Sequence, residues 1–398
     1  MPWKETSAMN QKIQLIADWL SGDYRKSELC EVYGISRPTV DKWIGRYQEL
    51  GAAGLEELSR APQRHPNQTA EELRALIMQT KLGRQKWGPK KVMDLLRAQR
   101  PELPWPADST AGEILKRAGL VQARKRRRRV TPYSEPFATC GAPNQSWSAD
   151  FKGDFLMDNG RRCYPLTISD NFSRYLLLCR ALARPTFGQV QPWFEWVFRE
   201  FGLPEVIRTD NGTPFASLAL GGLSKLSKWW IRLGIKPERI QPGKPAQNGR
   251  HERMHRTLKE AVAPQKDLLT QQSCYDPFLH EFNHERSHES LGRKPPVTVH
   301  YVSTRSYPVK IPEVQYESGV TVRHVRRRGE IKWRGQLIYL THVLANEPVG
   351  LKLIAEDKWE VRYSFHLLGV LEGKNKRITT EKTWHRTQKC KRCARSKT

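Results

Sequence analysis

Three carboxylates stand where an α/β fold gathers catalytic groups. Asp150 lies in a predicted strand, and Asp210 directly follows a short apolar strand over residues 205–208. Glu252 lies in the first turns of a helix predicted over about residues 246–261. Because strand ends and helix starts meet at one sheet edge in such folds, we expect the three carboxylates to converge there. Carboxylate oxygens suit Mg²⁺ or Mn²⁺, and a pair of such ions can activate an oxygen nucleophile and stabilise the leaving oxygen of a phosphodiester.

The residues around these carboxylates predict a mixed α/β sheet. Alternating apolar positions and the turn at Asp158, Asn159 and Gly160 indicate three antiparallel strands that begin with a tight hairpin. Helices and strands then alternate, which is typical of an α/β layer. The expected strands cover residues 147–151, 163–168, 175–182, 205–208 and 235–240, and the expected helices cover residues 187–201, 222–233 and 246–261.

The first sixty residues predict a helix-turn-helix DNA-binding domain over residues 1–60. Apolar residues recur with helical spacing over residues 9–21, and two shorter helices flank a turn at Gly34. Ser36 is a suitable N-cap, and Pro38 lies in the first turn of the second helix, where its missing N–H is harmless. That helix would enter a major groove, although a plain helical hairpin has the same pattern. The side chains left to face DNA are Arg37, Thr39, Lys42 and Arg46.

The rest of the chain divides by composition. Residues 65–122 predict a second helix-turn-helix-like domain, residues 144–305 hold the α/β core, and residues 310–372 predict a small β-barrel. The tail over residues 373–398 is basic and is expected to be disordered. Residues 123–143 form a basic linker, which we expect to follow DNA phosphates, with a nuclear-localisation signal as the alternative. Its consecutive cations are Arg124, Lys125, Arg126, Arg127, Arg128 and Arg129. The expected fold class is therefore multidomain, with all-α units, an α/β core and a β-barrel.

The overall charge points to a polyanionic partner. The chain holds 68 Lys and Arg against 41 Asp and Glu, a formal net charge of +27. A chain this basic repels itself unless it meets a polyanion, and nucleic acid is the commonest one. No apolar run reaches the ~18 residues of a membrane span, and the N-terminus lacks the pattern of a signal peptide. Since the seven cysteines follow no disulfide framework, we expect a cytoplasmic protein without a membrane partner.

Short motifs follow one another in order along the expected core. They are Trp147 to Phe151, Thr167 to Arg174, Thr209 to Gly212, Pro242 to Gly249, Glu252 to Lys259, and Phe282 to Gly292. This ordered set resembles the insertion-sequence transposases whose catalytic core is similar to that of retroviral integrases. The resemblance covers roughly residues 25–300. It implies an RNase H-like core in which Asp150, Asp210 and Glu252 form the metal-binding DDE triad, with two Mg²⁺ or Mn²⁺ ions.

The chain departs from the family's pattern at two places. The interval from Asp210 to Glu252 is longer than is typical, with the extra length around residues 216–230. Phe282 and Ser287 replace the Tyr and Pro that are usual at those positions.

Basic side chains near the triad are candidates for DNA contact. Residues three, four and seven positions after Glu252 share or adjoin one face of its helix, where cations would bind phosphates. A solvated face on a basic protein is the alternative for each of them. The candidates in the core are Asn211, Lys244, Arg250, His255, Arg256 and Lys259.

The resemblance implies a DNA transposase of a bacterial, nucleoid-associated kind. Such a protein binds double-stranded DNA at the terminal repeats of a mobile element, cleaves to free 3′-OH ends, and joins them to target DNA. Pairing two ends implies a homo-oligomer on DNA. The alternatives are a catalytically silent, domesticated transposase that acts as a DNA-binding regulator, and a structure-selective nuclease with the same core fold.

Other motifs predict competing sites. His280, Glu281 and His284 fit the H-E-x-x-H pattern of zinc peptidases, but Ser287 and Ser290 stand where the longer metzincin pattern requires Gly and His. The tail residues His385, Cys390 and Cys393 lack an evident fourth zinc ligand. Asp170 is interpreted as part of a structural turn.

Overall fold

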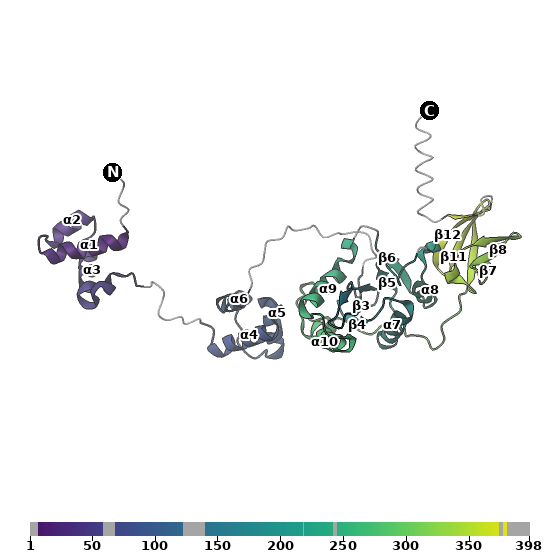
Figure 1. Cartoon of the computed structure of the whole chain (residues 1–398), viewed down its shortest axis with the longest axis horizontal. Helices are drawn as coiled ribbons and strands as arrows, with labels where there is room; N and C mark the ends of the chain where they lie inside the picture. Colours follow the sequence, from purple (N-terminus) through teal and green to yellow (C-terminus); the bar gives the residue numbers. More distant parts are fainter. Residues whose placement is uncertain are drawn as a thin grey trace, which may run out of the picture. The chain divides into compact units, whose positions relative to one another are not determined.

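We describe a computed structural model of the chain, in which residues 7–58, 68–121, 140–217, 219–241, 245–373 and 377–379 are described. The chain divides into two compact units, residues 1–69 and residues 70–398, and each is treated by itself (Figure 1). In the described ranges, no helix has both the length and the apolar character that crossing a membrane requires.

The first unit is a three-helix domain, in which the helix expected over residues 9–21 is confirmed as α1. Leu29, Val40 and Trp43 are buried in its core. Gly34 has a φ of 64° and donates its N–H to Cys30 at the end of α2, so the turn needs a left-handed residue. Ser36 occupies the N-cap of α3, but its hydroxyl contacts Thr39 Oγ1 at 2.9 Å instead of a backbone N–H. The helices are α1 (Ala8–Ser21), α2 (Lys26–Tyr33) and α3 (Arg37–Leu50).

The second unit begins with another three-helix domain, which has its own core. Ile77, Trp87 and Met93 are buried in this core. The N–H of Leu120 donates to Leu115 O at 2.9 Å, and Gly119 has a φ of 71°, so the expected glycine after the third helix is confirmed. The helices are α4 (Glu71–Gly83), α5 (Pro89–Gln99) and α6 (Asp108–Arg117).

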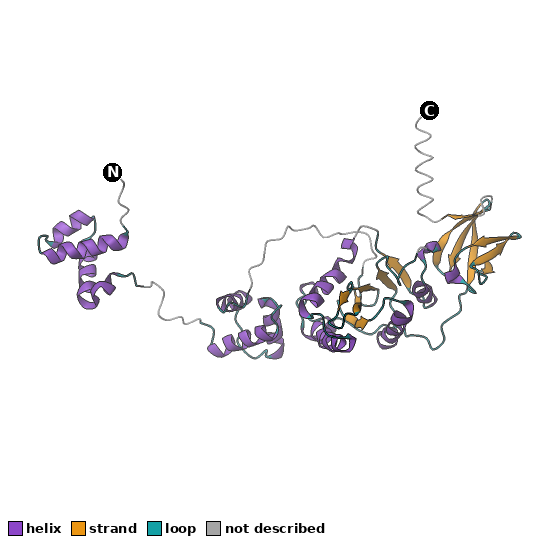
Figure 2. Ribbon diagram, in the orientation of Figure 1, coloured by secondary structure: helices purple, strands orange, loops and turns teal. Residues whose placement is uncertain are grey.

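A mixed sheet forms the centre of the second unit, as the sequence predicts (Figure 2). The strands follow the order β2-β3-β1-β5-β6, and β4 also pairs with β3. β1 is antiparallel to β3 and parallel to β5, and β5 is parallel to β6. The strands are β1 (Ser146–Phe151), β2 (Phe155–Leu156), β3 (Arg162–Asp170), β4 (Leu176–Leu182), β5 (Val206–Thr209) and β6 (Lys236–Arg239).

Two separate apolar cores cover this sheet. Phe194 and Trp230, from α7 and α8, pack with Trp147 of β1 in one core. Met254 of α9 and Phe278 of α10 pack with strand residues in another. Helices therefore hold the sheet on both sides (Figure 2). The helices are α7 (Phe187–Phe201), α8 (Lys225–Arg232), α9 (Gly249–Ala261) and α10 (Leu268–His280).

The C-terminal domain is β-rich, but a closed barrel is not confirmed. Its described strands form a five-stranded sheet of order β13-β12-β11-β10-β7 and a separate β8-β9 hairpin. The two sheets share one core, in which the rings of Trp333 and Trp359 lie 5.3 Å apart. Since no pairing joins the edges of these described strands, the domain is two packed sheets and the expected barrel closure is not observed. The strands are β7 (Thr321–His324), β8 (Glu330–Trp333), β9 (Gln336–Tyr339), β10 (Pro348–Ala355), β11 (Lys358–Tyr363), β12 (His366–Glu372) and β13 (Arg377–Thr379).

The C-terminal domain is joined to the central domain by an apolar contact, which we call the apolar joint. Leu223 and Ile231 of the central domain are buried in the same cluster as the core of the two packed sheets. Beside them, Lys228 Nζ lies 3.1 Å from Oε1 of Glu347. The other carboxylate oxygen of Glu347 accepts a hydrogen bond from the Tyr363 hydroxyl. The unusually long interval before Glu252 therefore builds the surface that carries the C-terminal domain.

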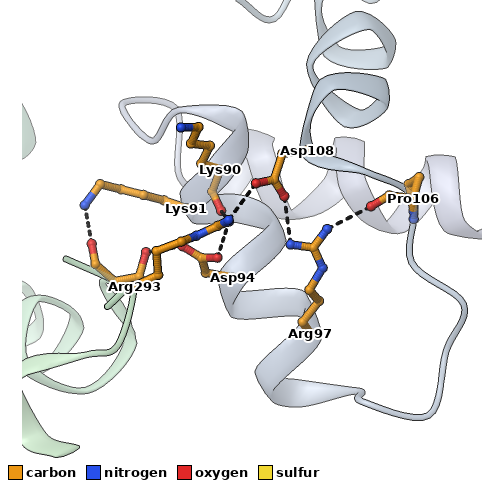
Figure 3. Close-up of polar contacts among 8 residues, drawn as sticks. Lys90, Lys91, Asp94, Arg97, Pro106, Asp108 and Arg293 are labelled. Carbon is orange, nitrogen blue, oxygen red and sulfur yellow. Dashed lines mark hydrogen bonds and ion pairs between the residues drawn. The ribbon is translucent and has the colours of Figure 1, made fainter. Parts of the chain in front are cut away.

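The α4–α6 domain is joined to the central domain by polar contacts, which we call the polar joint (Figure 3). The guanidinium of Arg293 bridges Asp94 of α5 and Asp108 at the start of α6, the latter at 2.8 Å. Lys91 donates to the carbonyl of Ser287, and the Ser287 hydroxyl donates to Asp94 at 2.5 Å. Ser287 thus uses its hydroxyl at this joint.

Candidate active site

The first two carboxylates lie at corresponding positions of adjacent parallel strands. β1 and β5 are paired so that Ser148 is opposite Arg208. Asp150 lies two residues after Ser148, near the end of β1, and Asp210 lies two residues after Arg208, just past β5. The register therefore brings both side chains to the same edge of the sheet, as the sequence predicts.

The third carboxylate comes from the helix that follows β6. Glu252 lies in the first turn of α9 and is exposed. Asn248, at the N-cap of α9, donates from Nδ2 to a carboxylate oxygen of Asp150 at 3.2 Å. This hydrogen bond ties the start of α9 to β1, next to the turn that carries Glu252.

The three carboxylates influence one another electrostatically. Burial raises the pKa of Asp150 to about 7, and the negative charges of Asp210 and then Glu252 add to the rise. Hydrogen bonds from the Phe151 backbone and from Asn248 oppose it. A bound cation would offset this repulsion.

The available donors suit a hard divalent cation. Carboxylate and amide oxygens are the ligands that Mg²⁺ and Mn²⁺ prefer. The amide oxygen Oδ1 of Asn248 is buried and has no hydrogen-bond partner among the described residues, although its Nδ2 is bound to Asp150. An unpaired buried acceptor next to the carboxylates could bind a water of the ion's hydration shell. The residues present therefore fit such a metal.

A buried polar cluster lies directly beside Asp150. The Thr167 hydroxyl lies 2.7 Å from His251 Nε2, 2.6 Å from His255 Nε2 and 3.0 Å from the backbone oxygen of Asp150. Ser169 Oγ lies 2.8 Å from His251 Nδ1. Ligand atoms of Asp150, His251 and His255 all lie within 4.8 Å of one another, a group that does not include Asp210 or Glu252.

His255 is a part of this cluster, away from solvent. Its side chain is buried, and burial followed by the charge of Lys152 lowers its pKa to about 3. A buried, neutral imidazole bonded to Thr167 does not reach a DNA phosphate, so the expected contact of His255 with DNA is not supported by its position. Arg256 and Lys259, the other two helix residues, are exposed on α9.

The other DNA-contact candidates in the core lie at the periphery of the site. Asn211 donates from Nδ2 to Ile240 O at 2.8 Å, which ties the Asp210 loop to the end of β6. Arg250 is exposed on α9 and donates to Asn171 O at 3.1 Å. Lys244 and the linker cations Arg124 to Arg129 lie outside the described residues.

In the first unit, the four helix-turn-helix candidates differ in their surroundings. Arg37 and Lys42 are exposed on α3, whereas Thr39 is half-buried beside Ser36. Lys42 Nζ and the guanidinium carbon of Arg46 both lie over the Trp43 ring, 4.7 and 5.1 Å from its centre, and Arg46 is half-buried. Arg37 and Lys42 are therefore the most accessible of the four.

Sequence reasoning missed several residues of the site. Thr167, His251 and Asn248 were given no role, although two of them lie in the motifs around β3 and α9. The four-residue spacing of the two α9 histidines was an available signal, because it places them on one helix face. Lys152, two residues after Asp150, was also missed, and its charge acts on His255.

The competing motifs have structural explanations. Asp170 accepts hydrogen bonds from the backbone N–H groups of Asn144, Phe172 and Ser173, which confirms the structural turn. Glu281 accepts a hydrogen bond from the Trp87 indole at 2.8 Å, so it belongs to the polar joint. The H-E-x-x-H residues form no metal-ligand group within the described part of the chain. His385, Cys390 and Cys393 lie outside the described residues.

Models of known protein families match both the N-terminal helices and the central domain. Residues 141–245 match a family model described as an integrase core domain, and residues 233–296 match a second model of the same description. A helix-turn-helix model matches residues 11–63, and a homeodomain-like model matches residues 39–115. The central domain therefore matches an integrase core domain and holds a mixed sheet, and helix-turn-helix matches precede it.

Individual relatives come from mobile elements. A 39.2 kDa protein of insertion element IS476 from Xanthomonas euvesicatoria is 28% identical over 256 residues, which span 62% of this chain and 71% of the relative. A 31.7 kDa protein of insertion element IS407 from Burkholderia multivorans is 30% identical over 195 residues, 45% of this chain and 64% of the relative. The HTLV-2 integrase catalytic core domain, solved in complex with magnesium, is 19% identical with a TM-score of 0.33 and covers 40% of this chain and 99% of that one. The chain thus holds an integrase core domain and is similar to proteins of insertion elements.

Proposed function

We propose that the chain is a DNA transposase that binds the ends of a mobile element, hydrolyses a strand to free a 3′-OH, and joins that end to target DNA. The placement of three carboxylates carries this proposal: Asp150 and Asp210 lie at the ends of adjacent parallel strands, and Glu252 lies in the first turn of the helix whose N-cap, Asn248, is bonded to Asp150. Asp150, Asp210 and Glu252 would hold two Mg²⁺ or Mn²⁺ ions. Bound there, the ions would supply Lewis acidity for phosphodiester transesterification.

The remaining residues of the site would position DNA and the carboxylates. Asn248 holds the Asp150 carboxylate by its hydrogen bond. Arg250, Arg256 and Lys259 are exposed cations on α9, next to the carboxylates, and would bind the phosphates of the cleaved strand. In the joining step, the freed 3′-OH would attack a target phosphorus and displace the 3′-oxygen of the target strand.

Recognition of the element would rest on the helix-turn-helix domains. Their family matches and the net charge of +27 support binding to double-stranded DNA. The exposed Arg37 and Lys42 of α3 would read the terminal repeats. Two ends must be held together for joining, so we expect a homo-oligomer on DNA, at work on the nucleoid in the bacterial cytoplasm.

A joining assay tests this function. The full-length protein is incubated with labelled element ends, a supercoiled target plasmid and Mg²⁺, and the products are separated by size. We expect joined products, which Asp150→Asn abolishes while binding to the ends persists. Asp154→Asn is the matched control, because Asp154 is exposed and pairs with Arg162.

Two results would contradict the proposal. Binding of the ends without any cleavage by the unmodified protein would indicate a catalytically silent regulator. Cleavage that depends on DNA structure and yields no joined product would indicate a nuclease.

A further inference from the structure

A single hydroxyl group links the elements that carry two of the triad carboxylates. Thr167 of β3 is opposite Asp150 in the antiparallel pairing of β1 and β3, and its hydroxyl lies 3.0 Å from the Asp150 backbone oxygen. The same hydroxyl contacts Nε2 of His251 and of His255, on successive turns of α9. Thr167 and both rings are buried, so water does not replace these contacts.

Counting donors and acceptors fixes the direction of each hydrogen bond. A hydroxyl has one proton to donate and two lone pairs to accept with. The Asp150 backbone oxygen can only accept, so Thr167 donates its proton there. Thr167 must then accept from an N–H on Nε2 of both His251 and His255. His251 Nδ1 is left with a lone pair, which accepts from the Ser169 hydroxyl at 2.8 Å.

We propose that Thr167, His251 and His255 are positioning residues, which fix the rotation of α9 so that Glu252 is presented at the edge that carries Asp150. Glu252 directly follows the buried His251 yet is itself exposed, since successive residues on a helix point about 100° apart. Rotating α9 enough to turn Glu252 away would break both histidine contacts at once. This inference rests on the proposed function, because it assigns Glu252 to the triad.

The same geometry argues against a separate metal site at this cluster. Two imidazoles and a carboxylate are a known ligand set for transition metals. Here the Nε2 atoms of His251 and His255 both carry protons directed at Thr167, and Nδ1 of His251 accepts from Ser169, so neither Nε2 offers a lone pair to a metal. Zinc binding at this cluster is therefore an outcome that would overturn the proposal.

A matched set of hydroxyl variants tests the positioning role. Thr167→Val keeps the shape of the side chain and removes the hydroxyl, and Thr167→Ser keeps the hydroxyl. Thr341→Val is the control, since Thr341 is equally buried and its hydroxyl accepts from Val343 N in the C-terminal domain. Binding of Mn²⁺ to the full-length, DNA-free protein is measured by calorimetry, with unfolding curves recorded for each variant.

We expect Thr167→Val to weaken Mn²⁺ binding about tenfold, as lost ligand positioning typically does. Thr167→Ser and Thr341→Val should stay within about twofold of the unmodified protein, the latter even where it lowers the unfolding midpoint. Should Thr167→Val fail to fold, His255→Leu and His255→Gln form a second pair, in which only the glutamine keeps an N–H donor. Equal Mn²⁺ affinity in a folded Thr167→Val and in Thr167→Ser would overturn the proposal.

Nitrogen-15 NMR of histidine-labelled protein provides a second readout. We expect His251 and His255 to be neutral with the proton on Nε2, and to lose that signature in Thr167→Val. A proton on Nδ1 of both rings, or stoichiometric Zn²⁺ uptake that His255→Gln abolishes, would overturn the proposal. Because neither readout requires DNA joining, a protein that binds Mn²⁺ as expected but joins no DNA would contradict only the proposed function.

Discussion

The central domain carries a neighbour on each side, and the two joints are built from opposite chemistry. At the apolar joint, Leu223 and Ile231 are less than 2% exposed and belong to the core of the C-terminal domain. At the polar joint, Arg293 bridges Asp94 and Asp108, and no residue of the central domain joins the described apolar core of the α4–α6 domain.

This difference predicts which neighbour can separate from the central domain. Undocking at the apolar joint would expose buried side chains to water, at about 25 cal/mol for each Å² of apolar surface. Ions at the polar joint can exchange their partners for water at little net cost, since partly exposed ion pairs contribute about 0–1 kcal/mol each. We therefore expect the C-terminal domain to unfold with the core, and the α4–α6 domain to undock reversibly.

Shortening the buried side chains of the apolar joint should have the largest effect. We expect Ile231→Ala and Leu223→Ala each to lower the free energy of unfolding by about 2–4 kcal/mol, because each leaves a cavity in a shared core. Urea unfolding followed by tryptophan fluorescence measures the loss. Leu337→Ala is the control, since Leu337 is 52% exposed, and a loss as small as the control's would show that the joint is not part of one core.

Removing the guanidinium of the polar joint should have a smaller effect, confined to docking. Arg293→Met leaves Asp94 and Asp108 without this partner, which we expect to cost about 2 kcal/mol. The replacement is methionine because Arg293 has a φ of 66°, a left-handed conformation that favours glycine. Arg293→Gly would therefore stabilise the backbone while it removes the guanidinium, and the two effects would be mixed. Hydrogen exchange over residues 281–294 should accelerate while exchange in β3 does not change.

Arg74→Met is the matched control for that variant. Arg74 pairs with Glu71 within α4, away from the joint. Its loss should leave exchange over residues 281–294 as it is in the unmodified protein. Faster exchange throughout the central domain in Arg293→Met would instead show that the polar joint is part of the core's stability.

The sequence predicts the helices and strands of the domains, but it does not predict which surfaces of those domains contact each other. The helix expected over residues 187–201 is α7 with the same bounds, because apolar periodicity is a local signal. The extra length around residues 216–230 was visible, but its use as a docking surface depends on strands more than a hundred residues later. Barrel closure was expected and is not observed, since strand propensity does not determine how sheet edges pair.

The site shows the same limit. Order and spacing along the chain predict the three carboxylates; the pairing of β1 with β5 brings Asp150 and Asp210 to one sheet edge, and the triad itself stays a prediction. Helical spacing also grouped His255 with Arg256 and Lys259 as candidates for DNA contact. Spacing shows which residues are neighbours on a helix, but not whether they face solvent or the protein core. Whether His255 faces solvent depends on Thr167, which lies 88 residues away in the chain.

The pH dependence of docking offers a narrower test of the polar joint. Burial, and then the charge of Arg286, lower the pKa of Lys91 to about 8, while Glu289 and Asp94 act in the opposite direction. Undocked Lys91 keeps its ordinary value of 10.5 and binds more protons between pH 8 and 10.5, so docking should tighten as the pH rises through that window. We expect a gain of about 1 kcal/mol after solvent screening.

Hydrogen exchange over residues 281–294, corrected for intrinsic rates, measures this gain. Lys91→Met should abolish the pH dependence, because it removes the titrating group. A gain that persists in Lys91→Met would assign the effect to another group.

Raising the salt concentration should give the smallest difference in docking free energy between the two joints. Raising the ionic strength from about 0.1 to 1 M shortens the screening length from about 10 to 3 Å, which weakens partly exposed ion pairs. We expect docking at the polar joint to lose less than about 1 kcal/mol, and the apolar joint to lose less than that, because most of its contact is the burial of Leu223 and Ile231 and only the Lys228–Glu347 pair is screened. Exchange over residues 281–294 should therefore rise with salt while exchange in α8 does not. Parallel changes in both segments would mean that Lys228 and Glu347, rather than the apolar side chains, hold the C-terminal domain in place.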